Sequence, residues 1–275
     1  MSETNNVQKI NLSSVLRSKN PKLLKLIPKF IIRWVEKLIH QDELNEILEK
    51  HGHLKGVDFA SASLKHLRVS YQVHGLEKTD PGRRYIIASN HPLGGLDGIV
   101  LVEIFGMFFD KNVKFVVNDL LMSVDPMRPV FVPVNKYGRQ SIDNAKLIHD
   151  AYSSDCQILY FPAGLCSRLI DGKVEDLEWK KSFFTQAIKY ERDIIPVYFS
   201  GKNSNLFYRI ANLRKSLGIK FNFELILLPR EMFRQKKMKF DVFVGDAIPF
   251  EKFSKEKNAA YWINYVREKV YSLKS

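Results

Sequence analysis

Short apolar strand-like runs alternate with helical segments over most of this chain, and this feature most constrains its fold. Residues 68–74 alternate apolar and polar side chains, as in a half-buried strand, and residues 85–88 form a run typical of a central strand. The remaining segments are strand-like at 113–117, 130–134, 157–161, 194–199 and 240–244, and helix-like at 98–109, 139–152, 179–190, 206–216 and 255–273. This order predicts an α/β fold with a largely parallel, mixed sheet flanked by helices.

The helix predicted at 139–152 illustrates which side of such a segment we expect to be buried. Its apolar side chains recur at helical spacing, and we expect them to face the core. They are Ile142, Ala145, Leu147, Ile148 and Ala151.

A basic amphipathic segment precedes the first strand. In residues 21–40 the Lys and Arg side chains fall within an arc of about 120° at 100° per residue, and bulky apolar side chains lie largely opposite. A Lys-rich face opposite Trp and Phe is typical of a helix that lies in the headgroup region of a bilayer. A helix packed on its own domain with solvated lysines is the alternative. The residues that we expect at a membrane surface are Lys25, Lys29, Phe30, Arg33 and Trp34.

This segment leads us to divide the chain into two parts. A length of 275 residues suits one large domain with an added arm. We predict an N-terminal amphipathic helical arm for membrane association, residues 1–66, and a catalytic domain, residues 67–275.

The net charge of +13 and the pI of about 9.5 favour anionic partners. Residues 9–37 hold eight Lys or Arg and one acid, so over half of the excess lies there. Because this charge accompanies apolar interfacial side chains and no recognisable nucleic-acid module, we expect membrane lipids and not nucleic acid as partner. Two cysteines argue against a disulfide framework, and neither a signal peptide nor an apolar run of 18 residues is visible.

The turn after the strand at 85–88 carries the first candidate site. Its sequence, NHPLGGLDG, places His91 and Asp97 between a strand and a helix, where α/β proteins place active sites. An Asp beside a His fixes the tautomer of the imidazole, so the pair could act as a general base. The backbone N–H groups near Gly94 and Gly95 could stabilise an oxyanion. The alternative is a structural His beside a turn Asp.

A second candidate loop follows the strand at 157–161, with the sequence FPAGLCSR. Its turn at Gly164, with Ser167 and Arg168 just beyond, suits a polar headgroup or a phosphate. An ordinary turn with a surface Arg is the alternative. Cys166 near His91 is a weaker candidate for a nucleophile, and the absence of a G-x-S-x-G motif disfavours a serine hydrolase.

The order of these blocks resembles the glycerolipid acyltransferase superfamily, the family of 1-acyl-glycerol-3-phosphate acyltransferases. The resemblance covers about residues 69–248 and rests on four blocks: Asn-His with a downstream Asp, a Phe-Val-Pro strand, Phe-Pro-X-Gly with Ser-Arg after it, and IIPVYFSG at 194–201. It implies that His91 acts as general base on the acceptor hydroxyl, that Asp97 orients it, and that Lys136, Gly164, Ser167 and Arg168 serve the acceptor.

The chain departs from the family pattern at several positions. Five residues separate His91 from Asp97 where the family usually has four. In the acceptor blocks two cationic positions of the family are lost, one of them to Cys166, which removes bidentate phosphate contacts. The chain in this respect resembles bacterial relatives that acylate an N-acylated amino-acid lipid, such as a lyso-ornithine or glycine lipid.

We therefore expect an O-acyltransferase of membrane lipid biosynthesis. It moves a fatty acyl group from a thioester of acyl carrier protein or coenzyme A to the hydroxyl of a lyso-lipid, either an N-acyl amino-acid lipid or lysophosphatidic acid. The resemblance implies no metal and no cofactor beyond this co-substrate, and a peripheral position on the cytoplasmic face of the inner membrane. The alternative is an inactive lipid-binding protein of the same fold.

Overall fold

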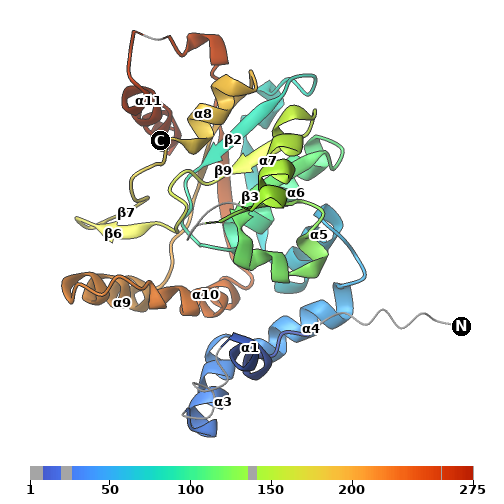
Figure 1. Cartoon of the computed structure of the whole chain (residues 1–275), viewed down its shortest axis with the longest axis vertical. Coiled ribbons are helices and arrows are strands. Elements are labelled where there is room, and N and C mark those ends of the chain that lie inside the picture. The colour runs from blue at the N-terminus through green and yellow to red at the C-terminus, as the bar shows by residue number, and fades with distance from the viewer. Residues whose placement is uncertain (1–8, 20–26, 136–140, 255, 275) are drawn as a thin grey trace, which may run out of the picture.

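The computed structural model describes residues 9–19, 27–135, 141–254 and 256–274. Within them, the main sheet has seven strands in the order β1-β9-β8-β2-β5-β3-β4 (Figure 1). Their bounds are β1 Ser70–His74, β2 Tyr85–Ser89, β3 Val113–Asn118, β4 Phe131–Val134, β5 Gln157–Tyr160, β8 Asp193–Phe199 and β9 Lys239–Val244. Neighbouring strands are parallel except β8 and β9, so β1 and β9 run opposite to the others. The predicted α/β fold with a largely parallel, mixed sheet is confirmed.

Helices cover both faces of this sheet. One face packs on α4 Gln41–His51, α5 Val57–Leu67 and α6 Leu96–Phe108; the other packs on α7 Ile142–Ser153, α8 Ser182–Lys189 and α11 Ala259–Ser272. Side chains of β2 alternate between the two cores, with Ile87 in the first and Ile86 in the second. Because both faces are covered, β2 and β8 are buried along their whole length, which explains their apolar runs at 85–88 and 194–199.

The remaining elements are short or lie outside the sheet. They are α1 Leu12–Lys19, α3 Lys29–Leu38, α9 Asn205–Ser216, α10 Leu228–Arg234, the hairpin of β6 Arg168–Ile170 and β7 Lys173–Glu175, and the 3₁₀ turns η1 Leu76–Lys78, η2 Asp119–Ser123, η3 Asp125–Met127, η4 Phe223–Leu227 and η5 Phe250–Lys252. In Figure 1, α9 and α10 lie at the same end of the molecule as α1, α3 and α4. This grouping brings the N-terminal helices next to a segment that follows β8.

The burial predicted for α7 is wrong for three of its five apolar residues. Ile142 is 88% exposed, and Ala145 and Leu147 are exposed as well. The residues that α7 does bury are Ala151 and Tyr152, at its C-terminal end. α7 lies over β4, an edge strand, so only its C-terminal half reaches the core, where Ala151 is buried and Ile148 packs against the core as predicted.

The N-terminal helices divide into two kinds. α4 and α5 contribute side chains to the main core, among them Leu48 and Leu64. α3 has no buried residue, and Phe30 and Trp34 are 71% and 62% exposed. The predicted boundary at 66/67 stays a prediction, although α4 and α5 share the core of the sheet domain. Lys25 lies outside the described residues.

No helix in the part of the chain that the structure describes has the length and apolar character needed to cross a bilayer.

A buried arginine ties the start of β8 to the end of α7. Arg192 is fully buried and donates to backbone carbonyls: Nε to Tyr152 (2.9 Å), Nη1 to Cys156 (2.6 Å), and Nη2 to Ser154. The last carbonyls of a helix have no intrahelical partner, so this guanidinium satisfies groups that would otherwise be buried without a donor.

We expect Arg192→Lys to destabilise the fold by about 2–4 kcal/mol, because a single ammonium cannot reach the same carbonyls as the planar guanidinium. Urea denaturation measures the effect. The matched control is Arg209→Lys on the exposed side of α9, for which we expect a change within about 0.5 kcal/mol. Equal stability of the two variants would show that the buried contacts contribute nothing.

Candidate active site

The loops after β2 and β5 lie side by side at one edge of the sheet, because these strands are parallel neighbours. Asn90 fixes the first loop: its Nδ2 donates to the Phe199 carbonyl (3.0 Å), and its Oδ1 accepts the Phe199 N–H (2.7 Å). The second loop is joined to the first where Ser167 N–H donates to the His91 carbonyl (2.7 Å). The structure therefore brings together the two blocks that the sequence singled out.

His91 and Asp97 are in contact despite the five residues between them. Asp97 Oδ2 lies 2.9 Å from His91 Nδ1. Asp97 stands in the first turn of α6, and the chain reaches it through Gly94, whose φ of +79° side-chain-bearing residues rarely adopt. A Cβ at Gly94 would also lie 2.7 Å from Leu228 Cδ2. A glycine is needed here so that the loop can turn and return the carboxylate to the imidazole.

Asp97 is a fully buried carboxylate surrounded by donors. Oδ2 also accepts the N–H groups of Leu93 (2.9 Å) and Gly94 (3.3 Å), and Oδ1 accepts the N–H of Gly98 (2.9 Å). Burial by itself raises the pKa of Asp97, but the His91 imidazole and the backbone donors outweigh it and lower that pKa below its ordinary value. Asp97 is therefore ionised at neutral pH and keeps the His91 proton on Nδ1.

This tautomer leaves His91 Nε2 with its lone pair. In the described part of the chain, no hydrogen-bond partner of Nε2 is found, and the side chain is 14% exposed. The ring of Phe161 stacks on the imidazole, with ring centroids 3.8 Å apart, and so holds its plane. A buried carboxylate and an oriented imidazole with one available nitrogen form the arrangement of a general base.

Asp176 supports the same loop from the other side, and the sequence analysis did not single it out. Its Oδ1 accepts the His91 N–H (3.1 Å) and the Ser167 hydroxyl (2.6 Å), and its Oδ2 accepts the Trp179 indole N–H (2.9 Å). Burial raises the pKa of Asp176, and these donors partly oppose that rise. Asp176 follows the β6–β7 hairpin in a stretch without a motif, and its contact with His91 joins residues 85 positions apart, so no sequence signal pointed to it.

The two glycines predicted to support an oxyanion differ in what their N–H groups do. The N–H of Gly94 donates to Asp97. Gly95 is the N-cap residue of α6, and its N–H has no hydrogen-bond partner among the residues described. The Leu96 N–H follows in the first turn, where a helix offers no internal acceptor. Leu96 is fully buried and Gly95 is exposed, so the available donor is the N–H of Gly95.

The residues predicted to bind the acceptor are mostly engaged within the protein. Ser167 is buried and donates to Asp176, and Arg168 is buried with its Nη2 2.7 Å from Glu224 Oε1. Their role toward an acceptor stays a prediction, and Arg168 could serve it only if the acceptor replaced Glu224. Lys136 lies outside the described residues.

The turn at Gly164 brings in a cation that the sequence analysis missed. Gly164 has a φ of +64°, and a Cβ there would lie 3.5 Å from the Lys180 ammonium nitrogen. Lys180 is exposed, and its backbone N–H donates to the Pro162 carbonyl (3.0 Å), which holds it over the loop. It is an accessible cation beside the second loop.

Cys166 does not have the surroundings of a nucleophile. It is buried, and burial raises the pKa of its thiol to about 11, against a smaller opposing effect of Arg168. The thiol is therefore protonated at neutral pH, and attack by a thiolate at this position is disfavoured.

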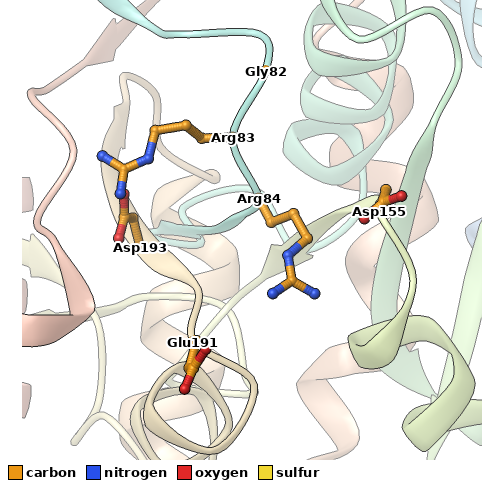
Figure 2. Close-up of a pocket in the computed structure, with 6 residues that line it drawn as sticks. All are labelled: Gly82, Arg83, Arg84, Asp155, Glu191 and Asp193. Carbon is orange, nitrogen blue, oxygen red and sulfur yellow. The ribbon is translucent and has the colours of Figure 1, made fainter.

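A cavity of about 320 Å³ lies away from this site (Figure 2). Its lining residues come just before β2, β5 and β8, so it opens at the amino ends of these strands, opposite His91. Arg83 spans it to Asp193, with 3.0 Å between Nη2 and Oδ2. The cavity is thus a charged surface hollow unconnected with the His–Asp pair.

A covered α/β sheet with a His–Asp pair at the carboxyl edge of its central strand is organised as an acid–base enzyme. A family model described as Acyltransferase matches residues 14–275. The chain belongs to this acyltransferase family, and the expectation of an acyltransferase enzyme is confirmed.

Two curated relatives are similar to the chain over nearly their whole length. A lyso-glycine lipid O-acyltransferase of Bacteroides thetaiotaomicron is 44% identical over 264 residues, which cover 96% of this chain and 97% of the relative. A protein of the same name from Phocaeicola vulgatus is 41% identical over 264 residues, covering 96% and 95%. A solved 1-acyl-sn-glycerophosphate acyltransferase from Thermotoga maritima is 17% identical, with a TM-score of 0.46 over 90% of this chain and 93% of that one. The family assignment rests on the family model and the two curated relatives.

We expect Asp176→Asn to destabilise the protein by about 1.5–3 kcal/mol, because the amide places a donor against groups that already donate. Chemical denaturation measures this. The adjacent Glu175→Gln is the matched control: Glu175 is partly exposed and pairs with Arg267 at 3.1 Å, so its loss costs about 1 kcal/mol or less. If Asp176→Asn were as stable as Glu175→Gln, the contacts of Asp176 would not stabilise the loops of the site.

Proposed function

We propose that the protein is an O-acyltransferase that moves a fatty acyl group from a thioester to the hydroxyl of a lyso-glycine lipid. The observation that carries this is the 2.9 Å contact of His91 Nδ1 with a buried, ionised Asp97. The acceptor class is supported by the two relatives named as lyso-glycine lipid O-acyltransferases, which are 44% and 41% identical to this chain. Acyl carrier protein and coenzyme A are both suitable thioester donors, and no bound cofactor is needed in this reaction.

The reaction follows from the two nitrogens of His91. Nε2 takes the proton of the acceptor hydroxyl while its oxygen attacks the thioester carbonyl carbon, and Asp97 stabilises the imidazolium that forms. The carbonyl oxygen becomes an oxyanion beside the N–H group of Gly95. The tetrahedral intermediate then collapses by breaking the carbon–sulfur bond, and His91 returns the proton to the departing thiolate. An ester and a free thiol result.

The headgroup chemistry supports an amino-acid lipid over a phosphate ester. An N-acylated glycine keeps one carboxylate, which a single exposed ammonium such as that of Lys180 can pair with. A phosphomonoester favours a planar guanidinium with two parallel N–H donors. Arg168 has its Nη2 on Glu224 and its Nη1 on the Cys166 carbonyl (2.6 Å), so it does not offer that surface.

The lipid acceptor calls for a position at a membrane surface. α3 supports one, because Phe30 and Trp34 project into solvent from the same helix as Lys29 and Arg33. The helix binds peripherally, with its apolar side chains among the lipid headgroups. A place on the cytoplasmic face of the inner membrane fits a donor made inside the cell.

We expect His91→Ala and Asp97→Asn each to lower kcat by about 10²–10⁴-fold, because each removes the oriented base. Turnover of purified protein with an acyl thioester and dispersed lyso-glycine lipid measures this. His53→Ala, an exposed histidine in the α4–α5 loop, is the control that keeps full activity. Thermal melting should place His91→Ala and His53→Ala near the parent protein. Asp97→Asn should melt lower, because its amide sets a donor against buried N–H groups that already donate, so its turnover is measured at a temperature where it is folded. Normal turnover of folded His91→Ala would reject the mechanism, and a parent protein that binds lipid without turnover would favour the inactive lipid-binding alternative.

In a mixture of equal amounts of lyso-glycine lipid and lysophosphatidic acid, we expect at least about a tenfold preference in kcat/KM for the glycine lipid. Mass spectrometry of the diacyl products measures the ratio. Lys180→Gln should raise KM for the glycine lipid and leave kcat unchanged, whereas Lys173→Gln, an exposed lysine on β7, should change neither. A preference for the phosphate acceptor would overturn the headgroup assignment and leave acyl transfer intact.

A further inference from the structure

α9 carries two apolar faces, and only one of them is covered. Phe207, Tyr208 and Ala211 are buried beneath it. Leu206, Leu213 and Leu217 fall within about 40° of one another at 100° per residue, on a different side, and all three are exposed. A helix that only packs on its own domain has polar residues on its outer face.

The chain beyond α9 extends this apolar surface. Ile219, Phe221, Phe223 and Ile226 are exposed, and Phe221 is 72% exposed. Residues 205–226 form what we call the α9–η4 surface: the outer side of α9, the turn that follows and η4. So many exposed large apolar side chains in one short segment mark a contact surface.

The charges of the α9–η4 surface are all positive where they reach solvent. Arg209, Lys215 and Lys220 are exposed. The one acid in residues 205–226 is Glu224, which is buried and paired with Arg168 (2.7 Å) and with Arg214 (2.9 Å). Exposed Leu and Phe beside Lys and Arg, with no exposed acid, complement an anionic lipid headgroup layer.

The α9–η4 surface adjoins both α3 and the candidate active site. Leu38, the last residue of α3, packs against the cluster beneath α9 that contains Phe207 and Leu227. In Figure 1, α9 and α3 lie at the same end of the molecule. On the other side, Leu228 lies against Gly94 of the His91 loop. The surface therefore lies at the same end of the molecule as one expected lipid contact, and the chain that follows it reaches the candidate site.

From these observations we propose that the α9–η4 surface is a second membrane-binding surface, which docks on anionic lipid and holds the His91 loop beside it. A second copy of the chain is a poorer occupant, because the exposed charges of the surface have one sign and would repel their copies. The use of this contact to reach a lyso-lipid rests on the function proposed above; binding to the lipid surface does not.

Vesicle flotation of the full chain tests the surface. The vesicles are phosphatidylcholine alone or phosphatidylcholine with phosphatidylglycerol. The surface variant is Leu217→Ser with Phe221→Ser, the α3 variant is Phe30→Ser with Trp34→Ser, and the control is Ile142→Ser, whose side chain is 88% exposed on α7. We expect the surface variant to lose about tenfold in partitioning to the anionic vesicles, and the control to float like the parent protein. The turnover of the surface variant on acceptor dispersed in detergent should equal that of the parent protein.

A second variant, Lys215→Gln with Lys220→Gln, is the charge variant, and it tests the proposal if the surface variant fails to fold. It should lose much of the preference for anionic vesicles and much of its sensitivity to salt. Flotation of the surface variant like the parent protein would overturn the proposal, even if the α3 variant no longer floats. An unchanged anionic preference of the charge variant would overturn it as well, and so would a dimer in sedimentation that depends on this surface while flotation does not. Flotation needs no turnover, so it still decides this question if the proposed function fails.

Discussion

The hydrogen bond between Asp97 and His91 requires a buried, ionised carboxylate, and the surrounding loop is built to stabilise that charge. A carboxylate without solvent contact is stable in its ionised form only if donors surround it, and three backbone N–H groups and one imidazole N–H do so here. Those N–H groups converge because Gly94 takes a backbone conformation that other residues rarely adopt. The glycine-rich turn thus allows a buried charge to orient the imidazole of His91.

Sequence periodicity predicted most of the sheet, because strands covered on both faces have continuous apolar runs and the helices between them are amphipathic. The position of His91 and Asp97 at the carboxyl edge followed from the same pattern. The reversed direction of β1 and β9 could not be predicted, since periodicity describes which faces are buried and not which strands pair. The exposure of Ile142 has the same origin: its helix has an apolar side, but the helix covers an edge strand.

The parts of the site that sequence reasoning missed are those made by contacts between distant segments. Asp176 supports His91 across 85 positions of the sequence, and Glu224 neutralises Arg168 across 56. Arg168 was predicted to face an acceptor because a motif gives the residue type and order. A motif does not say whether an acid elsewhere in the chain already pairs with the guanidinium. Burial decides this, because a buried arginine without a carboxylate or carbonyl partner would be strongly unfavourable.

The ion pair of Arg168 with Glu224 also connects the candidate active site to the α9–η4 surface. Glu224 belongs to η4, so the segment of residues 205–226 is fastened to the loop after β5 by a buried charge pair. Leu228, two residues beyond this segment, lies against Gly94 of the His91 loop. A base that must meet a hydroxyl in a lipid gains from being held at a fixed place relative to the lipid surface, because orientation removes much of the entropic cost of the encounter. A rigid connection of this kind serves that purpose better than a flexible anchor alone, which raises the local concentration but leaves the approach of the site undirected.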